Sequence, residues 1–145
     1  MKLLLVESYR PLARGLQRGL EEEGFAVTRA DDVRHAMRIL ESQCPDVVLL
    51  DIPRQIEFAL LQYWRRAGIS TPVLFFSVPG CRADQFNDLG LGPAALITKP
   101  FRFDDLLSQL RRLGALPYEA MLHSESGDLA MPRFASPAFA GPPRL

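Results

Sequence analysis

The sequence has few of the residues on which several common kinds of functional site depend. Its two cysteines, Cys44 and Cys81, have neither metal-ligand spacing nor the partners of a disulfide framework. Its two histidines, His35 and His123, have no catalytic partner visible in the sequence. The glycine-rich loops that cradle nucleotide phosphates are missing as well. These absences argue against a zinc site, a disulfide-stapled domain and the common nucleotide-binding motifs.

An excess of charge of either sign is also absent. Seventeen basic residues balance seventeen acidic ones, and the isoelectric point is near 6.7. Affinity for the phosphate backbone of nucleic acids depends on positive charge, so direct nucleic-acid binding is disfavoured. No apolar run approaches the roughly 18 residues of a membrane-spanning helix, and no signal-peptide pattern is present. We therefore expect a cytoplasmic protein that does not enter a membrane.

What is present suits a single packed domain followed by a tail. The chain has 145 residues, of which 48% are hydrophobic, and this is close to the usual size of one domain. The composition changes after Gly114, because residues 115–145 hold five of the twelve prolines. We expect a folded domain over residues 1–114 and a proline- and alanine-rich tail over residues 115–145.

Five short apolar or β-branched runs recur every 22 to 26 residues within the first 114. They begin at Leu3, Phe25, Val47, Val73 and Ala95. Each interval has room for a helix and two loops, and the continuous apolar runs are typical of strands buried on both faces. The pattern predicts an α/β fold in which five βα units form a doubly wound, five-stranded parallel sheet, a three-layer sandwich.

The segments between these runs carry helix signals of unequal strength. Pro11 suits the first turn of a helix that Gly24 can end. Asp31 or Asp32 can cap a second helix through its side-chain oxygen. The weakest segment is 82–90, which has only two apolar residues at helical positions.

Polar side chains stand where four of the predicted strands end. These residues are Glu7, Asp51, Ser77 and Lys99. Ligands of open parallel sheets bind outside the carboxyl ends of the strands, so the four side chains are expected to lie at one edge. Such a set suits a carboxylate that receives a phosphoryl group whose oxygens an ammonium and a hydroxyl hold.

Four motifs carry a resemblance to the receiver domains of bacterial response regulators. They are MKLLLVES, DVVLLD, TPVLFFS and ITKPF, which end at or contain the four strand-end residues. The phrase RRAGISTPVL resembles receivers that are joined to winged-helix effector domains. The resemblance covers residues 1 to about 113 and implies a flavodoxin-like fold that binds Mg²⁺. By this resemblance Asp51 is the phosphoacceptor, Lys99 the phosphate partner, Ser77 the switch hydroxyl and Glu7 a metal-site acid.

The sequence departs from the family pattern around the metal site. Ser8 stands where a second acid usually follows Glu7, and the loop 52–57 is about two residues shorter than usual. Glu7 and Asp51 remain as carboxylates, so we expect a weak Mg²⁺ site. Leu96 replaces the usual aromatic residue three positions before Lys99, and cannot repeat its coupling to the switch hydroxyl.

Other departures concern the surface. In the family, acids at the positions of Ala94 and Ala95 often form a dimer interface with arginines of the last helix. Here Arg111 lacks this expected partner, so the usual symmetric dimer is not predicted. The oligomeric state stays open. Arg10 and Arg54 could place a guanidinium at the metal position, but we interpret them as solvated loop arginines.

The tail contains the sequence GDLAM at residues 127–131, which is similar to the opening strand of a winged-helix effector domain. The remaining residues are too few to complete such a domain. We interpret the tail as a remnant of a linker and a truncated effector domain, so DNA binding by this chain is not implied.

Together these patterns predict a receiver domain that signals through contacts of its surface. We expect phosphorylation of Asp51 to be weak or absent, and we do not expect the protein to catalyse a reaction on a substrate. The alternative is a working phosphoacceptor that uses Mg²⁺ and labels itself on Asp51. A small flavodoxin-like cofactor-binding protein is the least favoured possibility, because the segment after the first strand lacks the hydroxyls and glycines that wrap a flavin phosphate. The expected partner is a histidine kinase or a downstream effector.

Overall fold

The computed structural model describes residues 1–51, 54–77 and 90–116. Several expectations concern residues outside these ranges. They include the weak helix expected at 82–90, apart from its last residue, as well as Cys81, His123 and the whole segment from 117 onward.

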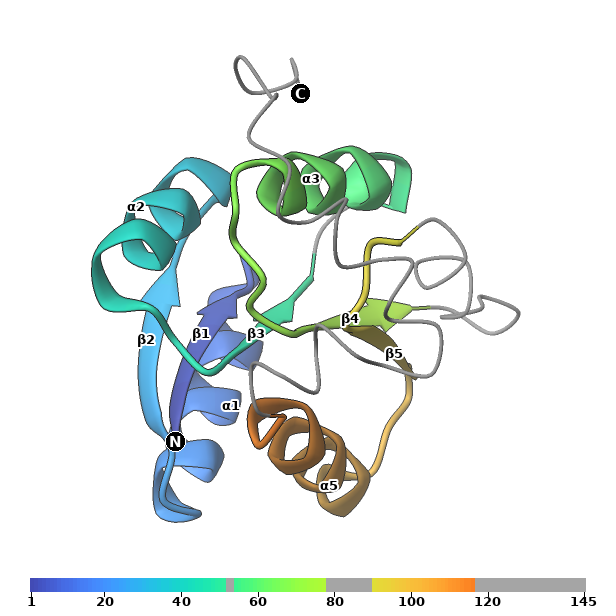
Figure 1. The fold of residues 1–145 in the computed structure, drawn as a ribbon. Coiled ribbons are helices and arrows are strands. Elements are labelled where there is room, and N and C mark those ends of the chain that lie inside the picture. The colour runs from blue at the N-terminus through green and yellow to red at the C-terminus, as the bar shows by residue number, and fades with distance from the viewer. Residues whose placement is uncertain (52–53, 78–89, 117–145) are drawn as a thin grey trace.

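The described residues form alternating strands and helices in the predicted order (Figure 1). The strands are β1 (Lys2–Val6), β2 (Ala26–Ala30), β3 (Val47–Leu50), β4 (Val73–Ser77) and β5 (Ala94–Thr98). The helices are α1 (Arg10–Glu22), α2 (Val33–Gln43), α3 (Arg54–Arg66) and α5 (Phe103–Gly114). No helix in the described ranges is long and apolar enough to cross a membrane.

The five strands form one parallel sheet in the order β2-β1-β3-β4-β5. This confirms the predicted doubly wound α/β fold with a flavodoxin-like strand order. Helices α2 and α3 cover one face of the sheet, and α1 and α5 cover the other (Figure 1). Between β4 and β5 the register runs from Val73 opposite Ala94 to Ser77 opposite Thr98. The register therefore aligns the ends of the two strands at the edge where the polar side chains were expected.

The helix ends follow the local signals in the sequence. Gly24 has φ +96°, a left-handed conformation that glycine adopts at low cost, and it directly follows the last turn of α1. Asp32 is the residue that caps α2, because its Oδ1 accepts a hydrogen bond of 2.8 Å from the backbone N–H of His35. The sequence had left Asp31 and Asp32 as alternatives.

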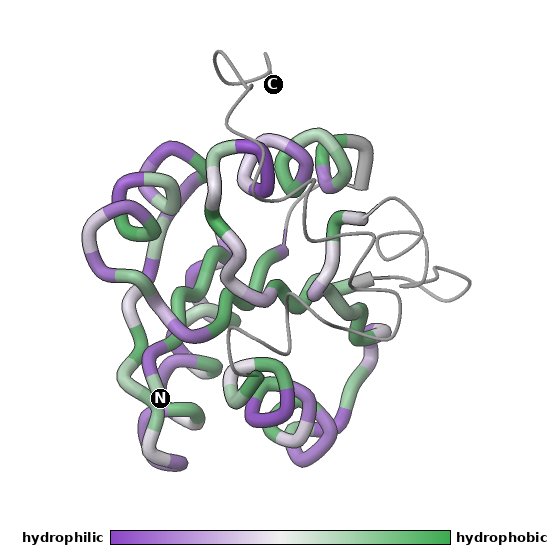
Figure 2. Tube along the Cα trace, viewed as in Figure 1, coloured by the Kyte–Doolittle hydropathy of each residue, from purple (hydrophilic) through white to green (hydrophobic). Residues whose placement is uncertain are grey.

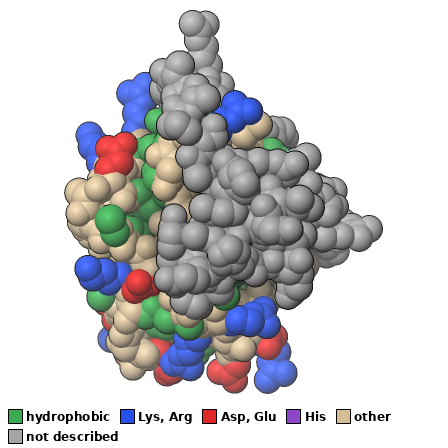
Figure 3. All heavy atoms as spheres, viewed as in Figure 1, with side chains coloured by type: hydrophobic (Ala, Val, Ile, Leu, Met, Phe, Trp, Pro, Cys, Tyr) green, Lys and Arg blue, Asp and Glu red, His purple; other side chains and the backbone are tan. Residues whose placement is uncertain are grey.

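Each face of the sheet has its own apolar core. The strands are the most hydrophobic part of the chain, whereas the helices alternate between apolar and polar residues (Figure 2). Successive strand residues point to opposite faces, so Phe75 packs with α2 and α3, and Phe76 packs with α1 and α5. On the face drawn in Figure 3, basic and acidic side chains are interspersed over the described residues.

A buried arginine joins the starts of β4 and β5. Arg65, in the last turn of α3, is 1% exposed and donates four hydrogen bonds to backbone carbonyls. The acceptors are Leu91 at 2.9 Å, Ile69 at 2.8 Å, Thr71 at 2.9 Å and Pro93 at 3.1 Å. Burial lowers the pKa of Arg65 to about 9, so the guanidinium is still protonated at neutral pH.

Candidate functional site

Three of the predicted site residues come together at the carboxyl edge of the sheet. Glu7 directly follows β1, Asp51 directly follows β3, and Lys99 directly follows β5. The backbone N–H of Asp51 donates to the carbonyl of Val6 at 2.9 Å, which holds the ends of β1 and β3 side by side. The spatial order of the strands, with β1 beside β3, thus places the two carboxylates next to each other.

Lys99 makes an ion pair with Asp51. The distance from Lys99 Nζ to Asp51 Oδ2 is 2.7 Å, and the side chains are 40% and 27% exposed. The ammonium also lies over the ring of Phe76, 4.7 Å from the ring centroid. The Lys99–Pro100 peptide bond is cis. The acceptor carboxylate predicted from the sequence is therefore already paired with the predicted lysine.

Glu7 is the buried member of the carboxylate pair. Its side chain accepts a hydrogen bond of 3.1 Å from the backbone N–H of Tyr9 on Oε2, and the residue is only 5% exposed. Its Oε1 is buried and has no hydrogen-bond partner among the described residues. Burial raises the pKa of Glu7 above its ordinary value of 4.5, and the neighbouring Asp51 carboxyl raises it further. The Tyr9 amide and the Lys99 ammonium oppose this rise without reversing it.

The other predicted residues are placed less completely. Ser77 ends β4 opposite Thr98, as expected, but its side chain lies outside what the structure describes. Ser8 is exposed. We expected Arg10 and Arg54 to lie in loops, and this was wrong. They are the first residues of α1 and α3. Pro11 lies in the first turn of α1, where proline is tolerated, and Arg10 precedes it as the first residue of the helix.

The sequence matches the response regulator receiver domain family over residues 3–111. The chain belongs to this family. Receiver domains are signalling modules of two-component systems. The match includes all the strands and helices described above, except the first residue of β1 and the last three residues of α5.

Two curated relatives are transcriptional regulatory proteins. The chain is 35% identical over 113 residues to DltR of Streptococcus agalactiae serotype III (strain NEM316), which is 77% of this chain and 50% of the relative. It is 34% identical over 136 residues to TcrA of Mycobacterium tuberculosis (strain ATCC 25618 / H37Rv), which is 90% of this chain and 53% of the relative. The chain thus spans about half the length of these relatives.

Solved receiver structures have the same fold. The receiver domain of the Francisella response regulator 1452 superposes with a TM-score of 0.67 at 27% identity, covering 78% of this chain and 95% of that one. The non-phosphorylated receiver domain of HemR from Leptospira biflexa gives a TM-score of 0.66 at 27% identity, covering 80% and 95%. These structures confirm the flavodoxin-like fold.

Receiver domains generally use Mg²⁺, so the donor set of this receiver can be tested for fit. Glu7 and Asp51 are adjacent carboxylates, and the buried Oε1 of Glu7 has no other described partner. Mg²⁺ is often held by one or two carboxylates and keeps several waters, so two such residues fit a minimal site. In the described ranges no group of three or more acidic, histidine or cysteine side chains is placed to hold a metal. Glu7 and Asp51 are therefore the described residues that could hold the ion.

The receiver also differs from the pattern expected for its last helix. Arg111 Nη2 makes an ion pair of 3.1 Å with Oε1 of Glu23, the C-cap residue that follows α1. The sequence left Arg111 without a partner, and the tertiary structure supplies one within the same chain. Leu96, which replaces the aromatic residue usual in the family, packs against the core on the α2 and α3 face.

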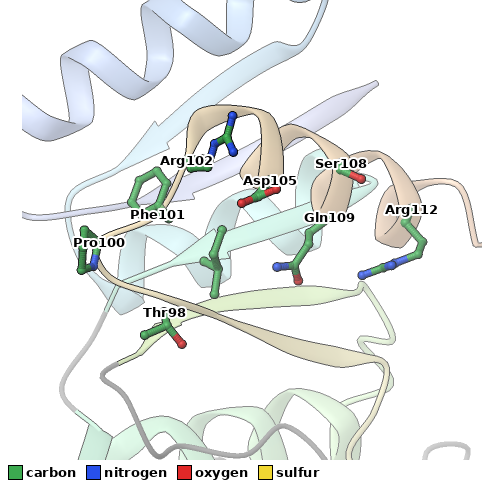
Figure 4. A pocket seen from close by; sticks show the side chains of 9 residues that line it. Thr98, Pro100, Phe101, Arg102, Asp105, Ser108, Gln109 and Arg112 are labelled. Carbon is green, nitrogen blue, oxygen red and sulfur yellow. The ribbon is translucent and has the colours of Figure 1, made fainter.

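A groove lies beside the site, between the end of β5 and helix α5 (Figure 4). It encloses about 430 Å³, and Thr98, Pro100 and Phe101 form its wall on the β5 side. Gln109 and Arg112 of α5 project toward Thr98 across the groove. Neither Asp51 nor Glu7 lines it, so the groove is separate from the carboxylate site.

Sequence reasoning missed two aromatic residues near Lys99. Phe76 contacts the ammonium, and its ring centroid is 5.2 Å from that of Phe101. Both phenylalanines were visible in the motifs that carry the family resemblance, each within two residues of a site residue. The alternation of β4 and the direction of the turn after Pro100, which decide where the rings point, could not be read from the motifs.

Proposed function

We propose that this receiver conveys its signal mainly through contacts of its surface, and that phosphorylation of Asp51 is weak. The observation that carries the proposal is the resting state of the acceptor, whose carboxylate is bound by Lys99 at 2.7 Å. In this arrangement an ammonium from the same chain already supplies the positive charge that a metal would otherwise bring to Asp51.

The state of Glu7 supports the same proposal. A metal takes up carboxylates in their ionised form, whereas burial and the neighbouring Asp51 carboxyl favour the protonated form of Glu7. A raised pKa disfavours the ionised form of Glu7 that Mg²⁺ binds, so this shift opposes metal binding in addition to the competition from Lys99. When bound, the ion would neutralise charge on an incoming phosphoryl group. With Ser8 in place of an acid, the chain has less carboxylate charge with which to offset these costs.

A working phosphoacceptor is the second candidate, and the assembled site favours it. Glu7, Asp51 and Lys99 meet at the carboxyl edge of the sheet, where this fold binds ligands. The family resemblance gives these three residues the roles of phosphoacceptor, phosphate partner and metal-site acid. The two candidates differ only in how well the site captures Mg²⁺ and phosphate, so one set of measurements separates them.

The partner and the output follow from two-component signalling. We propose a histidine kinase as the upstream partner. The curated relatives regulate transcription, and we propose a transcriptional output for this receiver. The chain carries balanced charge, so direct contact with DNA is not expected of the receiver itself. A flavin-binding role is not proposed, because the family of the chain is that of receivers.

The metal half of the proposal is tested by restoring the missing acid. Calorimetric titration with MgCl₂ is expected to show weak binding to the wild-type chain and binding at least about tenfold tighter, or about 1.4 kcal/mol, to Ser8→Asp. Ser42→Asp adds the same charge on α2, away from the site, and is expected to bind as the wild type does. Equal affinity of the wild type and Ser8→Asp contradicts a site limited by Ser8.

Labelling by acetyl phosphate tests the phosphorylation half. We expect a small labelled fraction of the wild type by intact mass, a larger fraction of Ser8→Asp, and none of Asp51→Asn. Rapid, near-complete labelling of the wild type would show that the second candidate is correct.

A further inference from the structure

The ammonium of Lys99 has two neighbours of different kinds. One is the Asp51 carboxylate, 2.7 Å away, and the other is the ring of Phe76, whose centroid is 4.7 Å from Nζ. A cation within about 6 Å of an aromatic centroid is attracted by the negative face of the ring. Asp51 directly follows β3, Phe76 lies in β4, and Lys99 directly follows β5. The ammonium therefore brings together residues from three neighbouring strands.

The ring of Phe76 is held in place by its own surroundings. The residue is 4% exposed and belongs to the core between the sheet and helices α1 and α5. Its centroid is 5.2 Å from that of Phe101, with 31° between the ring planes, a distance typical of favourable aromatic pairs. Phe101 in turn packs against the same core. A ring fixed on these sides cannot follow Lys99 if the lysine moves away.

We propose that Phe76 is a positioning residue for Lys99, whose fixed ring holds the ammonium against Asp51 in the resting receiver. This inference rests on the proposed function, in which Lys99 competes with Mg²⁺ for the Asp51 carboxylate. The Lys99–Asp51 pair is only partly buried, and an ion pair that water reaches confines a long lysine side chain only weakly. The aromatic surface stabilises one position of the ammonium and therefore raises the fraction of time that Asp51 is paired.

The simpler account is that charge attraction alone places Lys99, with the ring as a bystander. The two accounts differ in what happens when the ring is removed and Asp51 is kept. If Phe76 positions Lys99, the ammonium leaves its place over β4 in Phe76→Leu. If Asp51 alone determines the position of Lys99, the ammonium stays in place in Phe76→Leu and the lysine loses only the ring-current shift caused by Phe76.

The chain is well suited to an NMR test because it has only two lysines, Lys2 and Lys99. Protein prepared with ¹³C-labelled lysine gives ε-methylene signals from these two residues only, and Lys2→Arg assigns them. We expect an upfield ring-current shift for Lys99 relative to Lys2, and a nuclear Overhauser effect between the Phe76 ring and the Lys99 ε-protons. A wild type without that effect overturns the inference, whatever the variants do.

Three variants complete the test. Phe76→Leu is expected to abolish the upfield shift and to increase the picosecond–nanosecond mobility of the Lys99 ε-carbon in ¹³C relaxation to that of Lys2. Phe76→Tyr keeps a ring in place and is expected to retain both the shift and the low mobility. Phe75→Leu is the matched control, since it makes the same change one residue away on the opposite face of β4. Unchanged mobility in Phe76→Leu means that Asp51 alone positions Lys99, and the inference is then wrong.

The spectra are recorded without Mg²⁺ and without phosphodonor, which keeps this test separate from that of the proposed function. Efficient labelling of the wild type by acetyl phosphate refutes the proposed function but leaves the NMR result standing. An immobile Lys99 in Phe76→Leu, together with weak Mg²⁺ binding by the wild type, refutes only the role of Phe76.

Discussion

At the scale of single residues, the two adjacent acids at the carboxyl edge of this receiver, Glu7 and Asp51, differ in their contact with the Lys99 ammonium. Asp51 has the ammonium of Lys99 at 2.7 Å, while Glu7 is buried and has a single backbone N–H donor on one oxygen. Burial, together with the neighbouring Asp51 carboxyl, raises the pKa of Glu7.

The raised pKa of Glu7 predicts a pH dependence of stability. The folded chain holds the Glu7 proton more tightly than the unfolded chain, so the contribution of Glu7 to the free energy of unfolding is largest below about pH 4.5. It declines as the pH rises through the pKa of the folded state. Each tenfold difference in proton affinity corresponds to about 1.4 kcal/mol. Glu7→Gln keeps a neutral hydrogen-bonding side chain and should remove this decline.

Urea unfolding from pH 4 to pH 8 measures the effect. We expect Glu7→Gln to gain stability relative to the wild type as the pH rises, with the difference levelling off above the folded pKa. Glu41→Gln removes an exposed acid of α2 and serves as the control. Parallel curves for the wild type and Glu7→Gln would show that Glu7 titrates alike in the folded and unfolded states.

At the scale of secondary structure elements, Arg65 of α3 sets how β4 and β5 begin. Its guanidinium binds Thr71, two residues before β4, and Pro93, one residue before β5. A shift of register by one residue would turn every side chain of a strand to the opposite face. By fixing both strand starts, Arg65 supports the register that brings Thr98 level with Ser77 and leaves Lys99 at the site.

Replacing Arg65 should therefore loosen the β4–β5 edge of the sheet. Arg65→Met removes four charge-assisted hydrogen bonds to buried or partly buried carbonyls, so we expect a loss of about 3 kcal/mol or more in the free energy of unfolding. Hydrogen exchange should accelerate first in β4 and β5. Arg38→Met, at an exposed position of α2, should change stability by no more than about 0.5 kcal/mol. Uniform loss of protection over all five strands would contradict a local role for Arg65.

At the scale of the whole molecule, the sheet is sandwiched between two apolar cores, and the second extends slightly beyond the predicted domain boundary. Helix α5 ends at Gly114, the residue at which we predicted the domain boundary, but Leu116 also packs against the core formed with α1 and α5. Its backbone N–H also donates to the carbonyl of Leu113 at 3.2 Å. We therefore propose that the receiver domain includes residues 115 and 116.

Two shortened chains test this boundary. Residues 1–116 contain every described strand and helix and should unfold cooperatively with the stability of the full chain. Residues 1–114 lack Leu116 and should be less stable by about 1 kcal/mol, because a partly buried leucine loses its apolar contacts. Thermal and urea unfolding followed by circular dichroism measure both. A cooperative transition that is lost in residues 1–116 would place part of the core in the tail.

Much of the fold was predictable because its signals are local. The five apolar runs fixed the strands to within about one residue, since a strand buried on both faces needs a continuous apolar stretch. Gly24 and Asp32 ended and capped the helices by interactions within a few residues of each other. The positions of Glu7, Asp51 and Lys99 at one edge also followed, because parallel strands present their carboxyl ends together.

The remainder of the site depended on contacts between residues far apart in the chain. The motifs showed which charged groups stand at the strand ends, and hence the family, the fold and the candidate acceptor. They did not show that Lys99 lies between Asp51 and the Phe76 ring, that Glu7 is the buried acid, or that Arg65 binds carbonyls up to 28 residues away. Those features depend on strand register and on burial, which arise only when the sheet and its helices pack. The sequence by itself determined which chemical groups meet at the edge, and the tertiary structure decided how deeply each group is buried and which groups pair, because burial and pairing depend on how the sheet and its helices pack.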